Sequence, residues 1–154
     1  MITEDYVSFE VSKLLKEKGF DEKCRYVWIF DKANDPQDTN GISKVCAEQL
    51  IDGYFIDNSD IKKVAEYGDW FEDYHKAYLC PTLQIVLKWL REVHNLCIEP
   101  YRTACGYLYT ISTIPYGSCK CNPKDGGDDE DSGQWTSYEG ACEAAIKYCL
   151  TNLI

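Results

Sequence analysis

The sequence has few basic residues. Its 16 lysines and arginines are outnumbered by 26 aspartates and glutamates, which gives a formal net charge of -10. A surface of this charge repels the phosphates of nucleic acids and of anionic membranes, so we expect neither as a partner. Long apolar runs are absent too, and none approaches the length of a transmembrane helix. Residues 1–5 are mostly polar and lead into no apolar stretch, so we expect no signal peptide.

Histidine, the side chain most used for acid–base chemistry near neutral pH, is also scarce. The chain has two, His75 and His94. No nucleophile elbow, phosphate-binding loop, dinucleotide fingerprint or zinc-protease motif is present. We interpret His94 as part of a helix end and His75 as a surface residue; a pairing of His75 with Asp73 or with a distant cysteine is the remaining catalytic option. We therefore predict no catalytic residues and favour a protein that is not an enzyme.

The sequence offers no convincing metal or cofactor site. Cys119-Lys120-Cys121 is the closest cysteine pair, but a tetrahedral zinc site needs a second such pair. A calcium-like pattern begins in the acidic loop, with ligand positions at Asp128, Glu130, Ser132 and Glu139. Its third and fifth positions depart from the usual Asp or Asn, and no helix enters the loop. We predict neither a metal nor a cofactor.

Cysteine, by contrast, is abundant, with nine residues. An odd number of cysteines without a secretory signal indicates reduced thiols, and so a cytoplasmic location. Cys142 and Cys149 are seven positions apart on the apolar side of a predicted helix. We expect both to be buried as small hydrophobic residues.

The composition, 45% hydrophobic and 14% aromatic over 154 residues, is that of a globular protein. We predict a single α+β domain over residues 1–154, with a small, mostly antiparallel sheet packed against about three main helices. The main helices are expected over 3–18, 82–95 and 136–154. The main strands are expected over 24–30, 97–101 and 106–114. The first has apolar residues on both faces, which indicates a central strand covered on both sides or a sheet with an aromatic binding face. The other two are expected to form an antiparallel hairpin with a short turn near residues 102–104, and a brief strand is expected at 134–135. An acidic loop is expected over about 115–133.

Local signals define the ends of these helices. Thr3 is the expected N-cap of the first helix, and Gly19 the left-handed residue that ends it. Thr82 and Asn95 have the same roles in the central helix, whose apolar stripe includes Val93 and is widened by Ile85. Two shorter helices are expected, over 44–52 and from Asn58 or Ser59 to about 66. Thr136 and Glu139 form a capping box for the last helix.

One group of residues is a candidate ligand or partner surface. Aromatic rings alternate along the strand at 24–30, and again along the strand at 106–114. If both strands belong to one sheet, their rings share a face with nearby cations, a combination that binds nucleobases and protein hot spots. The alternative is that helices cover these rings as core. The candidate residues are Arg25, Tyr26, Trp28, Lys88, Arg102, Tyr107 and Tyr109.

Three stretches carry a resemblance. They are EDYVSFEVSKLLKEKGF at 4–20, PTLQ with KWLREVH at 81–94, and EAAIKYCL at 143–150. Together they resemble a group of short proteins of gut Bacteroides and of their phages and mobile elements, for which no activity is established. The resemblance covers about a third of the chain and implies a setting rather than a site: an accessory protein made in the cytoplasm of a bacterial host, often one that acts against host defence.

These observations lead to three functional hypotheses. The first is a non-enzymatic phage or mobile-element accessory protein that binds a host protein, such as a defence component. The second is a small-ligand protein that binds or sequesters a nucleotide-like signal on the aromatic face. The third is an enzyme of unknown class. The oligomeric state stays open, and the many aromatics are compatible with a homo-oligomer.

Overall fold

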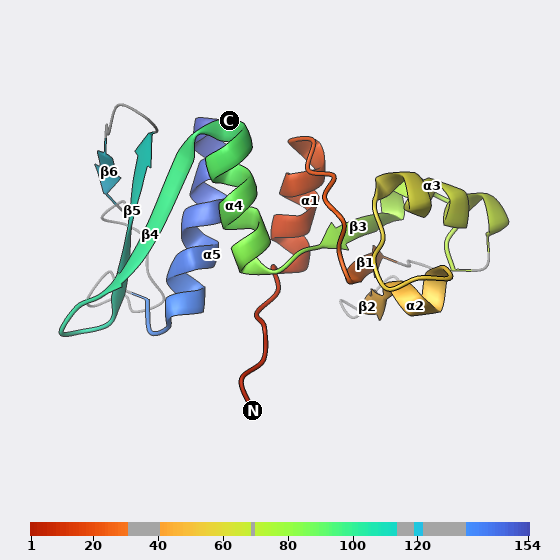
Figure 1. Ribbon diagram of the computed structural model, residues 1–154, viewed down its shortest axis with the longest axis horizontal. Helices are drawn as coiled ribbons and strands as arrows, with labels where there is room; N and C mark the ends of the chain where they lie inside the picture. The colour runs from red at the N-terminus through yellow and green to blue at the C-terminus, as the bar shows by residue number, and fades with distance from the viewer. Residues whose placement is uncertain (31–40, 69, 114–118, 122–134) are drawn as a thin grey trace. The chain divides into compact units, whose positions relative to one another are not determined.

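The computed structural model describes residues 1–30, 41–68, 70–113, 119–121 and 135–154 (Figure 1). The described residues form helices and antiparallel strands, which confirms the predicted α+β class. The strands belong to two three-stranded sheets, ordered β2-β1-β3 and β4-β5-β6. The chain divides into two compact units, Tyr6–Thr82 and a second one made of Met1–Asp5 with Leu83–Ile154. The expectation of a single domain over residues 1–154 stays a prediction.

The Tyr6–Thr82 unit is built around strand β1. Its elements in chain order are α1 (Phe9–Glu17), β1 (Tyr26–Phe30), β2 (Ile42–Cys46), α2 (Ala47–Leu50), α3 (Asn58–Tyr67), the 3-10 turn η2 (Tyr74–Lys76) and β3 (Ala77–Cys80). Strand β1 lies in the middle of its sheet, which agrees with one of the two predicted arrangements, and Trp28 lies opposite Lys44 of β2 and Tyr78 of β3. Val27 and Ile29 point to the other face and are buried. β1 therefore presents an aromatic side and an aliphatic side.

Helix α1 begins later than predicted. Its N-cap is Ser8, whose hydroxyl accepts a hydrogen bond from the Val11 amide, so the prediction of Thr3 as the cap is wrong. The reason is that the preceding residues are held in an extended form: the Val7 amide donates to the Pro81 carbonyl over 3.1 Å. The end of α1 is as predicted, because Gly19 has a φ of 84°, a conformation that glycine adopts without strain.

Strand β2 occupies part of a segment predicted to be helical. Residues 42–46 are extended, and only Ala47–Leu50 form a helical turn, so the helix predicted over 44–52 is mostly wrong. Val45 lies opposite Val27 and is buried with it, while Lys44 lies on the aromatic side. Pairing with β1 thus overrides a local pattern that fits a helix.

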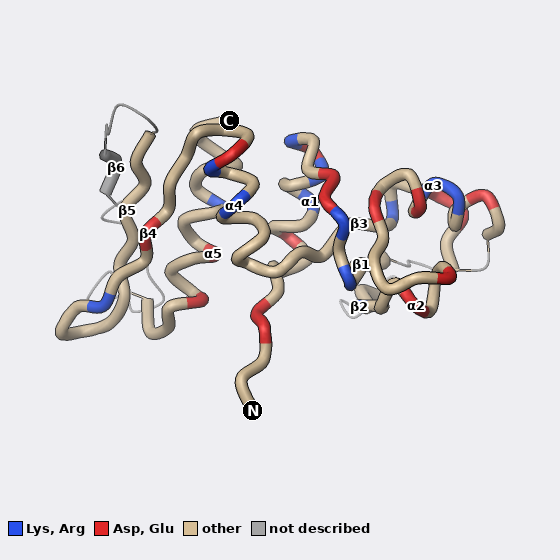
Figure 2. Tube along the Cα trace, in the orientation of Figure 1, with Lys and Arg blue, Asp and Glu red and all other residues tan. Residues whose placement is uncertain are grey.

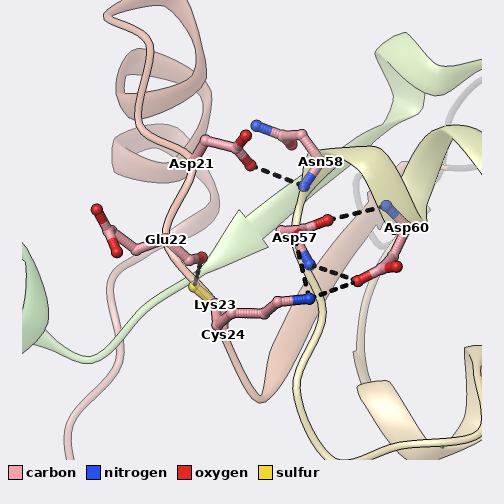
Figure 3. A network of polar contacts seen from close by, with 7 residues as sticks. All are labelled: Asp21, Glu22, Lys23, Cys24, Asp57, Asn58 and Asp60. Carbon is pink, nitrogen blue, oxygen red and sulfur yellow. Dashed lines mark hydrogen bonds and ion pairs between the residues drawn. The ribbon is translucent and has the colours of Figure 1, made fainter.

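The start of helix α3 is fixed by a network of charged groups (Figure 3). Asp57 is the N-cap, and its carboxylate accepts a hydrogen bond from the Asp60 amide over 3.0 Å. In return the Asp60 carboxylate accepts from the Asp57 amide, and the Lys23 ammonium pairs with both carboxylates at 2.9 Å and 3.0 Å. The hydrogen bond from the Asp60 amide, followed by Lys23, lowers the pKa of Asp57. The cap was predicted at Asn58 or Ser59 and therefore lies one or two residues earlier than expected.

The second unit combines two long helices with a hairpin. Its elements are α4 (Leu83–His94), β4 (Leu96–Arg102), β5 (Tyr107–Thr113), β6 (Cys119–Cys121), α5 (Tyr138–Tyr148) and a π-helical turn, Cys149–Leu153. α4 and α5 pack against each other and against β4, as can be followed in Figure 1. β4 and β5 pair antiparallel along their whole length, which confirms the predicted hairpin. β6 lies within the predicted loop at 115–133, so that loop is not free of strand.

Helix α4 is the predicted central helix. Val86 and Leu90 are fully buried, and Asn95 has the expected left-handed φ of 56°. Two residues assigned to its apolar stripe are instead exposed, Ile85 at 36% and Val93 at 56%. The buried face of α4 is therefore narrower than its composition suggests.

Helix α5 starts one residue after the predicted cap. Ser137 is the N-cap, and its hydroxyl accepts a hydrogen bond from the Gly140 amide over 3.0 Å, so the capping box expected from Thr136 and Glu139 is wrong. Trp135, which comes shortly before the helix, pairs with Tyr107 through two backbone hydrogen bonds, in agreement with the brief strand predicted there. That pairing sets where the helix can begin.

Candidate functional site

The aromatic face of the β2-β1-β3 sheet was the main candidate surface. We define it by five residues on the same side of the sheet: Tyr26, Trp28, Phe30, Lys44 and Tyr78. The ring of Phe9, from α1, lies against it with centroid separations of 6.4 Å, 6.0 Å and 5.3 Å to Trp28, Phe30 and Tyr78. The Trp28 indole N–H donates to the Val7 carbonyl over 3.2 Å. Trp28 is therefore engaged in the fold, as the core interpretation expected.

The exposed edge of the aromatic face already holds a cation. The Lys44 ammonium lies 4.9 Å, 5.0 Å and 5.9 Å from the ring centroids of Tyr6, Tyr26 and Trp28. These distances are those of cation–π contacts. A ligand that used these rings to bind a cation would have to displace Lys44.

By strand alternation, Arg25 lies on the opposite side of the strand from Tyr26. Its side chain is nevertheless long enough to bring the guanidinium carbon Cζ to 5.9 Å from the centroid of the Tyr26 ring. Its guanidinium also pairs with Glu48 of α2 over 3.6 Å. Both side chains are about half exposed, so the pair is a surface contact of small energy. Arg25 thus connects the candidate strand to α2.

The other predicted binding residues belong to the second unit: Lys88 lies on α4, and Arg102, Tyr107 and Tyr109 lie in the β4-β5-β6 sheet. Because β1 and β5 lie in different sheets, the condition for one shared aromatic face is not met. Tyr109 is 2% exposed and packs on Trp135 with centroids 5.1 Å apart, so it is a core residue and its assignment to a binding surface is wrong. Burial raises the pKa of Tyr109 to about 12.

Three candidates in this second unit remain at the surface or near it. Arg102 lies over the half-buried ring of Tyr107 at 5.1 Å, at the end of the hairpin. Lys88 is exposed on α4 and pairs with Glu92 one turn later over 3.9 Å. These are ordinary neighbour contacts within a hairpin and a helix, and they bring no further candidate residue to the same place.

Lys16 is the most perturbed cation in the described part of the chain, and sequence reasoning missed it. Its ammonium donates to the carbonyls of Tyr74 and Ala77 over 2.8 Å and 2.9 Å, and lies 3.6 Å from the Tyr74 ring centroid. Burial lowers the pKa of Lys16 to about 8, with Asp73 acting in the opposite direction. The side chain ties α1 to the start of β3. Nothing in the local sequence signals this, because the contact spans about sixty positions.

Among the described residues, the imidazole of His75 is not paired with Asp73, the partner considered for it in the catalytic alternative. His75 is exposed, and its link to Asp73 is a hydrogen bond from the His75 backbone amide, not from the imidazole. His94 packs edge-on against Trp89 with centroids 4.5 Å apart, and burial lowers its pKa. A histidine held in this way has a packing role at the helix end.

The described cysteines are free thiols, and several of them are core residues. Cys142 and Cys149 are fully buried, as predicted, and burial raises the pKa of each to about 12. Burial also raises the pKa of Cys24. Thiols of this kind stay protonated and unreactive near neutral pH.

The calcium-like pattern falls mostly outside the described residues. Asp128, Glu130 and Ser132 lie there, while Glu139 is exposed in the first turn of α5. Among the residues that the structure describes, no three His, Cys, Asp or Glu side chains gather into a group able to hold a metal ion.

A surface that the sequence reasoning did not single out follows helix α2. Here a hollow of about 260 Å³ opens to the surface, which we call the α2 hollow; it is lined by Glu48, Ile51, Asp52, Gly53 and Tyr54. Tyr54 is 67% exposed and the adjacent Phe55 58% exposed. Ile56, by contrast, is fully buried and bridges Cys24. Two successive aromatics directly after Gly53 were the available signal in the sequence.

A scan against protein-family models, a search of curated proteins and a search of solved structures each found no match. Within the described ranges, no helix has both the length and the apolar composition that crossing a bilayer requires.

Proposed function

We propose that this chain is a non-enzymatic accessory protein that acts by binding a protein of its host cell. The observation that carries the proposal is the adjacent exposure of Tyr54 and Phe55 beside the α2 hollow. Large aromatics left in water at a hollowed surface are typical of protein-contact sites, where they become buried anchors. The net charge of -10 favours solubility of the unbound protein even though these two aromatic side chains are exposed.

The setting of this proposal comes from the resemblance to Bacteroides phage and mobile-element proteins. The resemblance implies synthesis in the cytoplasm of a bacterial host, and a defence component is the target that we propose there. The reduced thiols are compatible with that compartment.

The test is affinity capture from a Bacteroides lysate, with recovered proteins identified by mass spectrometry. Wild type is compared with a Tyr54→Ser/Phe55→Ser variant and with a control, Tyr67→Ser/Trp70→Ser, that removes two other exposed aromatics from the same unit. A partner recovered by wild type and control but lost from the first variant supports the proposal. Recovery of no protein above background by wild type contradicts it.

A second proposal is that the chain binds a small nucleotide-like ligand. What favours it is the partly exposed aromatic edge around Lys44, where stacking rings and one cation meet. Native mass spectrometry of gently purified protein tests this idea. A mass excess that disappears on denaturation, and that a Lys44→Ala/Tyr26→Ala variant lacks, is the expected result; the bare chain mass would count against it.

A further inference from the structure

We propose that the α2 hollow receives a lysine or arginine side chain from a basic, apolar segment of the partner, while Tyr54 and Phe55 pack on the apolar residues beside it. This inference rests on the proposed function and names the chemistry of the partner. Three observations support it: the carboxylates that line the hollow, the few ion pairs that these carboxylates form, and an apolar lining that suits a long cationic side chain.

The lining of the hollow is acidic. From Ala47 to Asp57 the chain carries Glu48, Asp52 and Asp57 and no lysine or arginine, as Figure 2 shows along α2 and the segment that follows it. Asp57 is already paired with Lys23 at the start of α3. The two carboxylates that line the hollow, Glu48 and Asp52, give it a negative potential that attracts cations.

These two carboxylates are incompletely compensated. Glu48 pairs with Arg25 at 3.6 Å, a long contact between half-exposed groups. Asp52 is exposed and forms no ion pair with any basic side chain in the described ranges. A cation placed between them therefore gains attraction from both, with little existing pairing to break.

The rest of the lining suits the stem of a long cationic side chain. Ile51 offers an aliphatic wall, and the Tyr54 ring offers a face for an ammonium or guanidinium group. Gly53 adds no side chain to the hollow and leaves room for the incoming group. Among the described residues no third His, Cys, Asp or Glu side chain joins these two carboxylates, so they do not form the multi-ligand set that Zn²⁺ or Ca²⁺ takes. Phe55, next in the chain and exposed, extends the apolar contact beyond the hollow.

The experiment uses ¹⁵N-labelled protein and two synthetic peptides. The probe is acetyl-Gly-Leu-Arg-Leu-Arg-Gly-amide, and the matched peptide carries glutamine in place of each arginine. Backbone amide shifts are followed at low ionic strength for wild type, for Glu48→Gln/Asp52→Asn, and for Glu22→Gln/Glu66→Gln. The last variant removes the same charge from exposed positions elsewhere in the unit. Spermidine, a cation without apolar side chains, is titrated in parallel.

We expect saturable shifts confined to residues 47–55 with the arginine peptide, an affinity about tenfold lower for the Glu48/Asp52 variant, and little change for the Glu22/Glu66 variant. The glutamine peptide and spermidine should bind more weakly than the arginine peptide. Shifts spread over the whole acidic surface, equal weakening by both variants, or spermidine binding as tight as the peptide would overturn the inference. No lysate is involved, so this result is separate from the capture experiment that decides the proposed function.

Discussion

Lys16 gives the protein a pH dependence whose sign can be worked out. Burial lowers its pKa from 10.5 to about 8, so between these values the unfolded chain binds a proton that the folded chain has lost. Stability therefore rises with pH in this window. Integrating from about pH 7 to about pH 9.5 gives about 2 kcal/mol, and solvent screening of a half-buried group reduces this to about 1 kcal/mol. The neutral amine keeps two N–H donors for the Tyr74 and Ala77 carbonyls, so the contacts survive deprotonation.

Other groups act in the opposite direction over the same range. Burial raises the pKa of Tyr74, Tyr78 and Cys142, so their ionisation favours the unfolded state as pH rises. The measurement is therefore a difference: urea unfolding of wild type and of Lys16→Met at several pH values. The methionine keeps most of the stem and removes the titrating group, and all other ionisations cancel.

We expect the free energy of unfolding of wild type, minus that of Lys16→Met, to rise by about 1 kcal/mol between about pH 7 and about pH 9.5. A difference that stays flat, or that falls with pH, would refute the reasoning. It would mean that the two carbonyls and the aromatic rings stabilise the ammonium more than burial destabilises it.

Three further predictions concern the fold. Gly19→Ala should lower the free energy of unfolding by about 1–2 kcal/mol. A Cβ at this position meets no neighbouring atom, so the main cost is the strain of a positive φ. Gly53 has no positive φ, so Gly53→Ala should lower the free energy of unfolding less in the same urea titration. Leu90→Ala in the fully buried face of α4 should cost about 2–5 kcal/mol, against less than about 0.5 kcal/mol for Val93→Ala, as thermal unfolding will show. Ser137→Ala should cost about 1 kcal/mol and increase amide hydrogen exchange in the first turn of α5; unchanged exchange would argue against the cap.

The sequence predicted features that depend on one residue and its immediate neighbours. Gly19 and Asn95 end their helices because few other residues adopt a positive φ. The β4–β5 hairpin was predicted because its strands pair across a short turn. The starts of α1 and α5 were missed because several hydroxyl residues near each start can act as caps, and pairing of the preceding segment selects one. Strand β2 was missed because Val45 is extended only through its pairing with β1.

The candidate site was less predictable than the fold. Trp28 was singled out correctly as part of an aromatic face, but the sequence does not show that Phe9 packs on that face or that the indole bonds to Val7. Tyr109 followed the same alternation and proved to be core. Tyr54 is exposed, whereas Ile56, two positions later, is buried and pairs with Cys24, a contact between distant positions. Burial of this kind is a property of the folded chain and not of a local pattern.

The central position of β1 has a consequence for the order in which the sheet is made. β1 pairs with β2, which follows it soon in the chain, and with β3, from which residues 31–76 separate it. During synthesis one edge of β1 therefore stays without its partner until Ala77–Cys80 have left the ribosome. Closing so long a loop is slow compared with closing the β4–β5 turn. During this interval the unpaired edge of β1 is open to wrong strand pairing. The interval ends when β3 pairs with β1.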